Sequence, residues 1–123
     1  QPDVLRRLLQ RYAPGDGLEL GIELPAVKRV VLVACGTAWH AALVGRALIE
    51  RWAKIPAEAE VASEFRYGER PLNADTLVIA VSQSGETADT LAAVRLAHEA
   101  RARVLAIVNV PESSIARESD WVV

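Results

Sequence analysis

The chain has 123 residues, of which 14 are Lys or Arg and 16 are Asp or Glu, so its formal net charge is −2. This balance excludes a broadly basic nucleic-acid-binding domain, and a single cysteine excludes an internal disulfide. Two histidines and that cysteine are too few for a structural zinc site with four ligands, so we expect no metal and no cofactor. Hydrophobic residues make up 51% of the chain, which is enough for one domain with its own core.

No membrane or targeting segment is predicted, because the longest apolar stretches fall far short of the ~20 residues that cross a bilayer. The first residues show neither the basic start nor the apolar stretch of a signal peptide. With one cysteine, the simplest expectation is a cytoplasmic protein. Because the sequence contains no methionine, we expect it to be a piece of a longer polypeptide.

The N-terminal part of the chain predicts a short helix followed by a connecting segment. Apolar side chains recur at helical spacing over residues 1–13, at Val4, Leu5, Leu8, Leu9 and Tyr12. Two prolines and three glycines then interrupt any regular period over residues 14–25. We therefore expect residues 1–25 to form a linker and residues 26–123 to form the folded domain.

After residue 25, short β-branched runs alternate with longer Ala-rich segments of helical periodicity. The predicted strands are 30–34, 58–62, 76–81, 104–108 and 121–123, and the main predicted helices are 38–53 and 87–101. The central strands are apolar on both faces, which is typical of a parallel sheet covered on both sides. The sequence therefore predicts an α/β fold, a three-layer α/β/α sandwich with a five-stranded parallel sheet of the flavodoxin-like, doubly wound kind.

The most informative motif is SQSGET at residues 82–87, the serine loop, which leaves a predicted strand and enters a helix. The hydroxyls of Ser82, Ser84 and Thr87, with Gln83 beside them, can bind an anion at the start of a helix, and the glycine allows a tight turn. The motif has no lysine, so it is not a P-loop. A single phosphate monoester fits it better than a triphosphate.

A purely structural interpretation of the serine loop is also open. Ser84 or Thr87 could do no more than cap the following helix, because capping and anion binding use the same groups. Glu86 would repel an anion, so we expect its side chain to face outward or to orient a partner.

A second candidate loop is CGTA at residues 35–38, the CGTA loop, which follows the first predicted strand. Gly36 could offer a backbone N–H and Thr37 a hydroxyl to a polar ligand. A tight turn with Thr37 as the helix cap explains the same residues equally well, and the lone glycine does not match the G-x-G-x-x-G pattern of dinucleotide sites. Cys35 is predicted to be a small core residue, because no base stands at a defined spacing from it.

The remaining conspicuous residues are predicted to be structural. Trp39 and Trp52 are expected to be packing anchors of one helix. His40, on the same Ala-rich helix near the CGTA loop, could face a ligand, but a lone histidine there is usually structural. His98 is expected to be solvated near the C-terminal end of the second helix, where the helix dipole favours a histidine. Residues 63–68 are predicted to form a loop pinned by its aromatic side chains, with a subunit contact or a site wall as alternatives.

Six motifs taken together resemble one family. They are CGT (35–37), ASEFRY (62–67), SQSGETADT (82–90), NVP (109–111), SS (113–114) and RESD (117–120). From about residue 30 to the end, the chain resembles the first sugar isomerase (SIS) domain of the glutamine–fructose-6-phosphate aminotransferase (isomerizing) family, the glucosamine-6-phosphate synthases. The resemblance implies that residues 26–123 are an SIS domain that binds fructose 6-phosphate or glucosamine 6-phosphate. It implies phosphate contacts from Ser82, Gln83, Ser84 and Thr87, and sugar-side contacts from Gly36 and Thr37.

The resemblance also implies the role of the longer polypeptide, an enzyme that converts fructose 6-phosphate and glutamine to glucosamine 6-phosphate and glutamate. The implied partners are a glutaminase domain and a second SIS domain of the same polypeptide, and we expect a homodimer without nucleic-acid or membrane partners. The catalytic lysine, glutamate and histidine of the family belong to the second SIS half and the C-terminal tail. We therefore expect no catalytic residue here, and binding without turnover.

The chain departs from the family pattern at Ala38, where the family commonly has Ser, and this change removes a hydroxyl from the sugar side. Lys28 and Lys54 do not match the catalytic lysine of the family.

Three other functions stay open from the sequence. The first is a phosphosugar-sensing SIS module of a transcriptional regulator, although residues 1–25 hold no basic second helix that could read DNA. The second is a stand-alone SIS isomerase or deaminase, which would need a complete catalytic set within the chain. The third is a structural module whose serine loop is only a helix cap.

Overall fold

The secondary structure follows the predicted alternation of strands and helices. The computed structural model describes residues 2–13, 15 and 22–123. Its elements are α1 (Pro2–Tyr12), β1 (Arg29–Ala34), α2 (Thr37–Trp52), β2 (Ala57–Val61), α3 (Ala62–Tyr67), β3 (Thr76–Ser82), α4 (Ala88–Glu99), β4 (Arg103–Val108), α5 (Ser114–Arg117) and β5 (Trp121–Val122). The strands form one parallel sheet of five, in the order β2-β1-β3-β4-β5. The predicted α/β class is confirmed, and the strand order is that of a flavodoxin-like sheet.

The direction of strand order reverses between β1 and β3. From β1 the chain crosses to β2 on one side, and it then returns to β3 on the other side of β1. At the carboxyl ends of these strands, Ala34 is the register partner of both Val61 and Val81. Because the two connections diverge at this point, open parallel sheets bind their ligands here.

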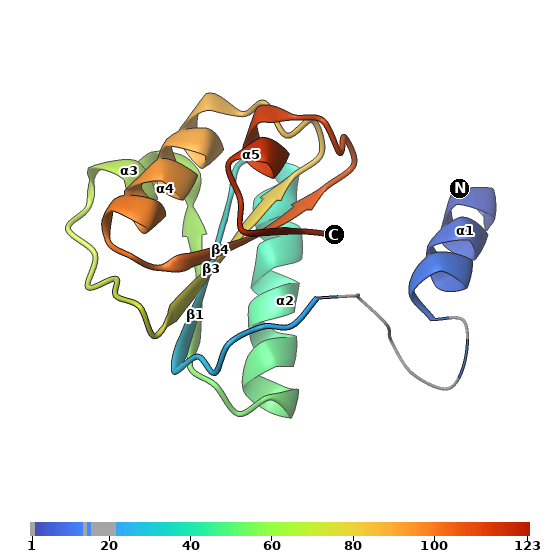
Figure 1. Ribbon diagram of the computed structural model, residues 1–123, viewed down its shortest axis with the longest axis horizontal. Helices are drawn as coiled ribbons and strands as arrows, with labels where there is room; N and C mark the ends of the chain where they lie inside the picture. Colours follow the sequence, from blue (N-terminus) through green and yellow to red (C-terminus); the bar gives the residue numbers. More distant parts are fainter. Residues whose placement is uncertain (1, 14, 16–21) are drawn as a thin grey trace.

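Two hydrophobic clusters lie on opposite faces of the sheet (Figure 1). Helices α3, α4 and α5 cover one face, where Phe65, Val94 and Ile115 are fully buried. Helix α2 covers the other face and approaches the sheet closely, since a Cβ on Gly45 would lie 2.9 Å from Leu32 Cδ2. The predicted three layers are confirmed.

The outer side of α2 differs from the prediction. Trp39 is half-buried and packs against the cluster beneath α2, as expected of an anchor. Trp52, however, exposes 72% of its surface, so its prediction as a packing anchor is wrong. It lies four residues after Leu48, which in turn follows Val44 by four, and both of these side chains are also exposed. We call Val44, Leu48 and Trp52 the outer stripe of α2.

Two short helices were not predicted. Residues 62–67 form α3 and not an aromatic-pinned loop, because Phe65 turns into the core while Tyr67 stays 79% exposed. Helix α5 begins after Ser113, whose hydroxyl accepts a hydrogen bond from the Ala116 N–H. That serine is a typical N-cap residue, and it is the local signal that could have located α5.

The predicted N-terminal helix is confirmed as α1, and none of its residues is buried. Most of the predicted connecting segment, residues 14 and 16–21, lies outside the described residues. Ile22 and Val27 already pack against the cluster beneath α2. The boundary between residues 25 and 26 stays a prediction. None of the helices described here has both the length and the apolar character needed to cross a membrane.

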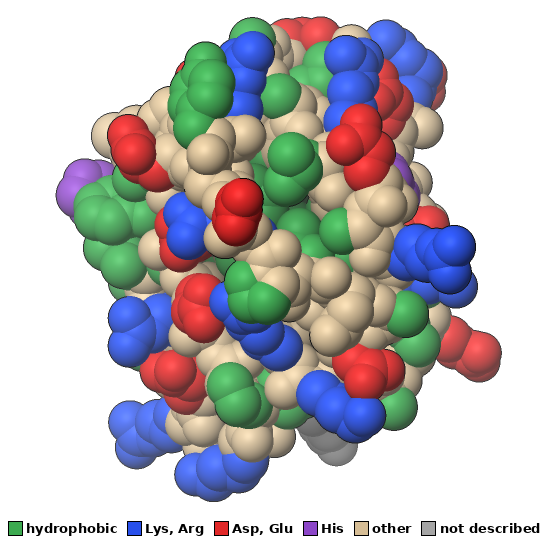
Figure 2. Space-filling model, turned by 90° about the vertical axis from the view of Figure 1, so that its left-hand side faces the viewer, with side chains coloured by type: hydrophobic (Ala, Val, Ile, Leu, Met, Phe, Trp, Pro, Cys, Tyr) green, Lys and Arg blue, Asp and Glu red, His purple; other side chains and the backbone are tan. Residues whose placement is uncertain are grey.

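The side of the molecule away from α1 carries charges of both signs (Figure 2). Basic and acidic side chains are interspersed there around small hydrophobic areas. Two ion pairs involve α3 or the loop after it, Arg66 with Asp89 at 3.0 Å and Arg70 with Glu60 at 3.0 Å. Because each pair joins different elements, these charges help to hold α3 against α4 and β2.

Candidate functional site

The candidate site lies at the carboxyl ends of β1 and β3, where the CGTA loop and the serine loop face each other. A cavity of about 230 Å³ is lined there by Cys35, Thr37, Ala38, Val81, Ser82, Gln83, Ser84 and Thr87. The structure therefore brings together the four predicted phosphate residues and Thr37. Gly36, the other predicted sugar-side residue, is not among the lining residues and contributes backbone geometry.

A second hollow of about 270 Å³ adjoins this cavity on the β4 side. The two share Thr37, Ala38, Val81, Ser82 and Gln83, and the second extends to Ile107, Val108 and Asn109. A ligand anchored at the serine loop thus has space to extend toward Asn109. This residue belongs to the NVP motif, and sequence reasoning did not assign it to the site.

The serine loop is ordered by its own hydroxyl groups. Ser82 Oγ accepts a hydrogen bond from the Gly85 N–H at 3.0 Å and lies 3.2 Å from Thr87 Oγ1. Two hydroxyls joined by one hydrogen bond use one of their two hydrogens, so the other can be donated to a ligand. Ser84 Oγ accepts from the Glu86 N–H at 3.2 Å, which closes a local turn.

These contacts also decide the helix-cap interpretation. Thr87 occupies the N-cap position of α4, but its side chain makes no capping hydrogen bond. Ser84 bonds within the turn and lies four residues before Ala88, the first residue of α4. The interpretation of either residue as only a helix cap is therefore wrong. The first N–H groups of α4 therefore have no side-chain cap from Thr87, and N–H groups at the start of a helix favour an anion.

Gly85 is the residue that fits the serine loop against α5. Its φ is +68°, and a Cβ built on it would lie 2.0 Å from Ser113 Oγ and 2.3 Å from Ser113 Cβ. Its carbonyl accepts a hydrogen bond from the Ile115 N–H at 3.0 Å. Only glycine satisfies both the positive φ and the close approach.

Glu86 turns away from the cavity toward α5. Its Oε1 accepts a hydrogen bond from the Ser114 N–H at 2.7 Å. The hydrogen bonds from Ser114, above all the one from its backbone, and the charge of Arg117 hold the pKa of Glu86 below its ordinary value, although some desolvation of this exposed side chain opposes the shift. The expectation that Glu86 faces outward or orients a partner is confirmed.

The CGTA loop has a simpler construction. Gly36 is the N-cap of α2 at φ +56°, and Thr37 is the first residue of that helix, so the prediction of Thr37 as the cap is wrong. Cys35 is half-buried and lines the cavity, with its Sγ 3.9 Å from Thr90 Oγ1. It is therefore part of the cavity wall and not a core residue.

The histidines lie outside the cavity lining. His40 is exposed, and its ring centroid is 5.2 Å from that of Trp39. His98 is exposed too, but its Nε2 lies 2.7 Å from the Glu118 carbonyl oxygen, so solvation alone does not explain it.

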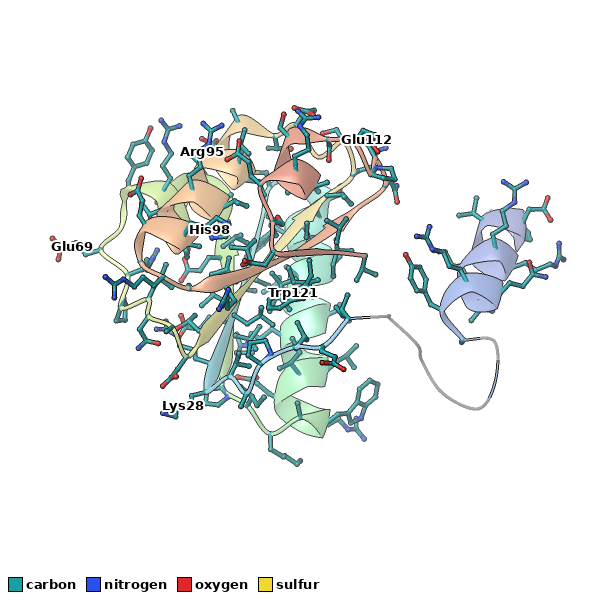
Figure 3. The ribbon with its side chains drawn as sticks, in the orientation of Figure 1. Lys28, Glu69, Arg95, His98, Glu112 and Trp121 are labelled. Carbon is teal, nitrogen blue, oxygen red and sulfur yellow. The ribbon has the colours of Figure 1, made fainter. Side chains whose placement is uncertain are left out.

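Lys28 lies at the amino end of β1, far from the serine loop (Figure 3). There it pairs with Asp75 at 2.7 Å, and the hydrogen bond and charge of Asp75 raise the pKa of Lys28. Lys54 follows the C-terminal end of α2. Neither lysine lines the cavity. No group of three His, Cys, Asp or Glu side chains in the described ranges is arranged to hold a metal ion.

A larger cavity of about 710 Å³ does not contain the serine loop. Its walls are apolar residues of α1, such as Leu5 and Leu9, and the ends of β4 and β5, such as Ile107 and Val122. It lacks the hydroxyl cluster that gives the smaller cavity its chemistry, so we place the site at the smaller one.

The fold and the site together define a protein of the SIS class. The family model for the SIS domain matches residues 23–123, and the chain belongs to this family. The predicted membership is therefore confirmed.

The relatives of the chain are more specific. It is 55% identical over 99% of its length to glutamine–fructose-6-phosphate aminotransferase [isomerizing] of Symbiobacterium thermophilum, and 59% identical over 80% to the protein of the same name from Streptomyces coelicolor. It spans 21% and 16% of those proteins. It also superposes with a TM-score of 0.76 and 41% identity on the C-terminal domain of glucosamine-fructose-6-phosphate aminotransferase from Francisella tularensis, covering 79% of this chain and 28% of that one.

Proposed function

We propose that this chain is the phosphosugar-binding SIS domain of a glutamine–fructose-6-phosphate aminotransferase and that its serine loop holds the phosphate of fructose 6-phosphate or glucosamine 6-phosphate. The observation that carries the proposal is the gathering of Thr37 and the four polar residues of the serine loop around one cavity. The names of the 55% and 59% identical relatives supply the substrate class.

The chemistry of the cavity suits a single phosphate. One hydroxyl hydrogen from the Ser82 and Thr87 pair is available to an anion, and the uncapped start of α4 adds N–H donors and the positive end of its dipole. No lysine lines the cavity, so the charge of a triphosphate would be poorly compensated. The phosphate serves as a handle, because binding energy at a distance from the reacting carbons can orient them.

The sugar extends from this anchor into the adjoining hollow. Thr37 borders both the cavity and the hollow, so its hydroxyl is the contact we assign to the sugar side. Gly36 sets the turn that starts α2 beside it. Ala38 borders both spaces as well and offers only a methyl group.

We infer that turnover needs parts of the polypeptide beyond this chain. The chain spans about a fifth of the S. thermophilum relative, and neither of its lysines lines the cavity. The chain alone is expected to bind sugar phosphate without converting it. The proposed partners are a glutaminase domain and a second SIS domain in the same polypeptide, and the proposed location is the cytoplasm.

We also propose that the assembled protein is a homodimer and that the second SIS domain covers the outer stripe of α2. The stripe exposes 60% of Val44, 38% of Leu48 and 72% of Trp52. Contiguous exposed apolar residues of this kind mark association surfaces.

The test of the phosphate site is a two-dimensional NMR titration of the chain with fructose 6-phosphate and glucosamine 6-phosphate. Unphosphorylated fructose and ATP are the control ligands. We expect saturable shifts centred on residues 82–87 with the two sugar phosphates only. The variant Ser82→Ala/Thr87→Ala should weaken binding at least about tenfold, because it removes the one hydroxyl hydrogen that this pair can donate to a charged group, together with the acceptor of the Gly85 N–H.

The control for this double variant is Ser63→Ala. It removes a single hydroxyl, from α3, and Ser63 lines neither space. Its affinity for fructose 6-phosphate should equal that of the unchanged chain. If no sugar phosphate shifts the serine loop, even after the second SIS domain is added, the proposal is wrong.

A further inference from the structure

Hydrogen bonds and close packing between the serine loop and α5, which we call the bridge, fix the serine loop on the side away from the cavity. We propose that Glu86 is a positioning residue of this site, because its carboxylate fixes the serine loop to the backbone of α5. The inference rests on the proposed function and deepens it, since it assigns a role to the one acidic residue of the serine loop.

The bridge consists of three contacts within a short stretch of chain. Glu86 Oε1 accepts from the Ser114 N–H at 2.7 Å, and the Gly85 carbonyl accepts from the Ile115 N–H at 3.0 Å. The Gly85 Cα packs so closely on Ser113 that no Cβ would fit. Of the three contacts, the one made by Glu86 is the only one that uses a side chain of the loop.

The other side of the bridge is itself anchored. Ser113 and Ile115 are 1% and 0% exposed, so α5 is fixed in the core. After α5, Glu118 accepts two hydrogen bonds from Arg95 of α4, at 2.7 and 2.6 Å. Figure 3 shows Arg95 and Glu112, the residue before Ser113, at the same end of the molecule. Because the serine loop is bound to α5, it is held in place by both α4 and the hydrophobic core.

The order that Glu86 imposes reaches the cavity through its neighbours. Its own N–H donates to Ser84 Oγ, and the Gly85 N–H before it donates to Ser82 Oγ. Both serine hydroxyls line the cavity. If the hydrogen bond between Glu86 and Ser114 is lost, the N–H groups of Gly85 and Glu86 gain freedom to move. The two serine hydroxyls that they orient become less ordered.

The charge of Glu86 makes the inference specific. A carboxylate next to a bound phosphate repels it, so removal of the charge alone should favour binding. Removal of the hydrogen bond to Ser114 should disfavour binding, because the loop must then be ordered when the ligand arrives. Gln keeps an acceptor oxygen without the charge, while Ala loses both. A positioning role therefore predicts that Glu86→Gln and Glu86→Ala differ in direction or size.

The experiment compares the unchanged chain with Glu86→Ala, Glu86→Gln and the control Glu69→Ala. Glu69 is exposed and lies at the opposite side of the molecule from α5 in Figure 3, so its variant removes the same charge elsewhere. Dissociation constants for fructose 6-phosphate and inorganic phosphate are measured by NMR titration. Amide hydrogen exchange of Ser114 is measured on the same samples without ligand.

We expect Glu86→Ala to raise both dissociation constants about tenfold, the size of one lost charge-assisted hydrogen bond, and to speed exchange at Ser114. Glu86→Gln should bind at least as tightly as the unchanged chain, and Glu69→Ala should match it. Equal affinity of Glu86→Ala and the unchanged chain, or equal weakening by Ala and Gln, overturns the positioning role alone. Absence of any binding by the unchanged chain with its second SIS domain overturns the proposed function and, with it, this inference.

Discussion

The serine loop and the CGTA loop face one cavity but are built in opposite ways. The serine loop lies against α5, which leaves no space for a Cβ on Gly85. The CGTA loop turns at Gly36, which also has a positive φ, yet nothing lies within 4 Å of the Cβ position there. One glycine is required by close packing and by its dihedral angle, and the other by its dihedral angle alone.

This difference suggests a division of labour within the site. The serine loop is ordered before a ligand arrives, so little free energy is lost in ordering it on binding. The CGTA loop is attached through β1 and the start of α2, and its Thr37 is exposed. Under the proposed function, the serine loop would anchor the phosphate and the CGTA loop would adapt to the sugar.

The largest expected effect is that of Gly85→Ala. A methyl group there would collide with the buried Ser113, and its backbone would be strained at φ +68°. We expect a loss of about 3 to 5 kcal/mol of unfolding free energy, from overpacking and a non-glycine residue at positive φ. Urea denaturation of the variant measures it. A loss below about 1 kcal/mol would show that the loop and α5 separate easily.

Ile115→Ala tests the bridge between the serine loop and α5 from the side of α5. Ile115 is fully buried, and its N–H holds the Gly85 carbonyl. The cavity left by the change should lower the unfolding free energy by about 3 kcal/mol, and the control Ile115→Val by about 1 kcal/mol. In addition, Ile115→Ala should weaken fructose 6-phosphate binding more than a core variant in β1, such as Val31→Ala, does. Equal binding by the two variants would mean that α5 does not position the loop.

The sequence predicted the strand, loop and helix around residues 82–87, because the signals for these elements are local. A β-branched run, small hydroxyl residues and an Ala-rich helix follow one another, and each depends only on near neighbours. The bridge between the serine loop and α5 could not be predicted. Ser114 is 28 residues from Glu86, and no local pattern in either segment indicates that the two are in contact.

The missed helix α3 and the wrong burial of Trp52 have a related cause. Helix α3 has only six residues, and it is stabilised by burial of Phe65 against α4 and β1, a tertiary effect that local periodicity does not show. Trp52 was assigned to the core because large aromatic residues usually are buried. Its position on α2 places it with Val44 and Leu48, on the side that points away from the sheet.

A smaller effect is expected for Gly36→Ala in the CGTA loop. The new methyl group meets open space, so only the strain at φ +56° remains, about 1 to 2 kcal/mol. The unfolding free energies of this variant and of Gly85→Ala, measured by chemical denaturation, should therefore differ by about 1 to 4 kcal/mol. If Gly36→Ala lowered the unfolding free energy more than Gly85→Ala does, the CGTA loop and not the serine loop would be the closely packed one.

The smallest effect concerns the ion pair between Arg95 and Glu118, which ties α5 to α4. The hydrogen bonds from Arg95, with smaller attractions to Arg117 and His98, hold the pKa of Glu118 below its ordinary value, although burial opposes the shift. A carboxyl group with a lowered pKa stabilises the folded state above its unfolded pKa of about 4.3, and this stabilisation is lost as the pH falls through its folded pKa.

Arg95→Ala should therefore lower the unfolding free energy only slightly at pH 7, because both side chains are partly exposed, and by less at pH 3, where Glu118 is closer to protonation. Urea denaturation at both pH values measures the change, and Glu118→Gln is the control that should show no such pH dependence at this site. An equal cost of Arg95→Ala at both pH values would mean that the arginine acts through the packing of its aliphatic stem. The contact between Arg95 and the segment after α5 would then stabilise the fold through apolar packing. The stability of the bridge between the serine loop and α5 would not depend on the ionisation of Glu118.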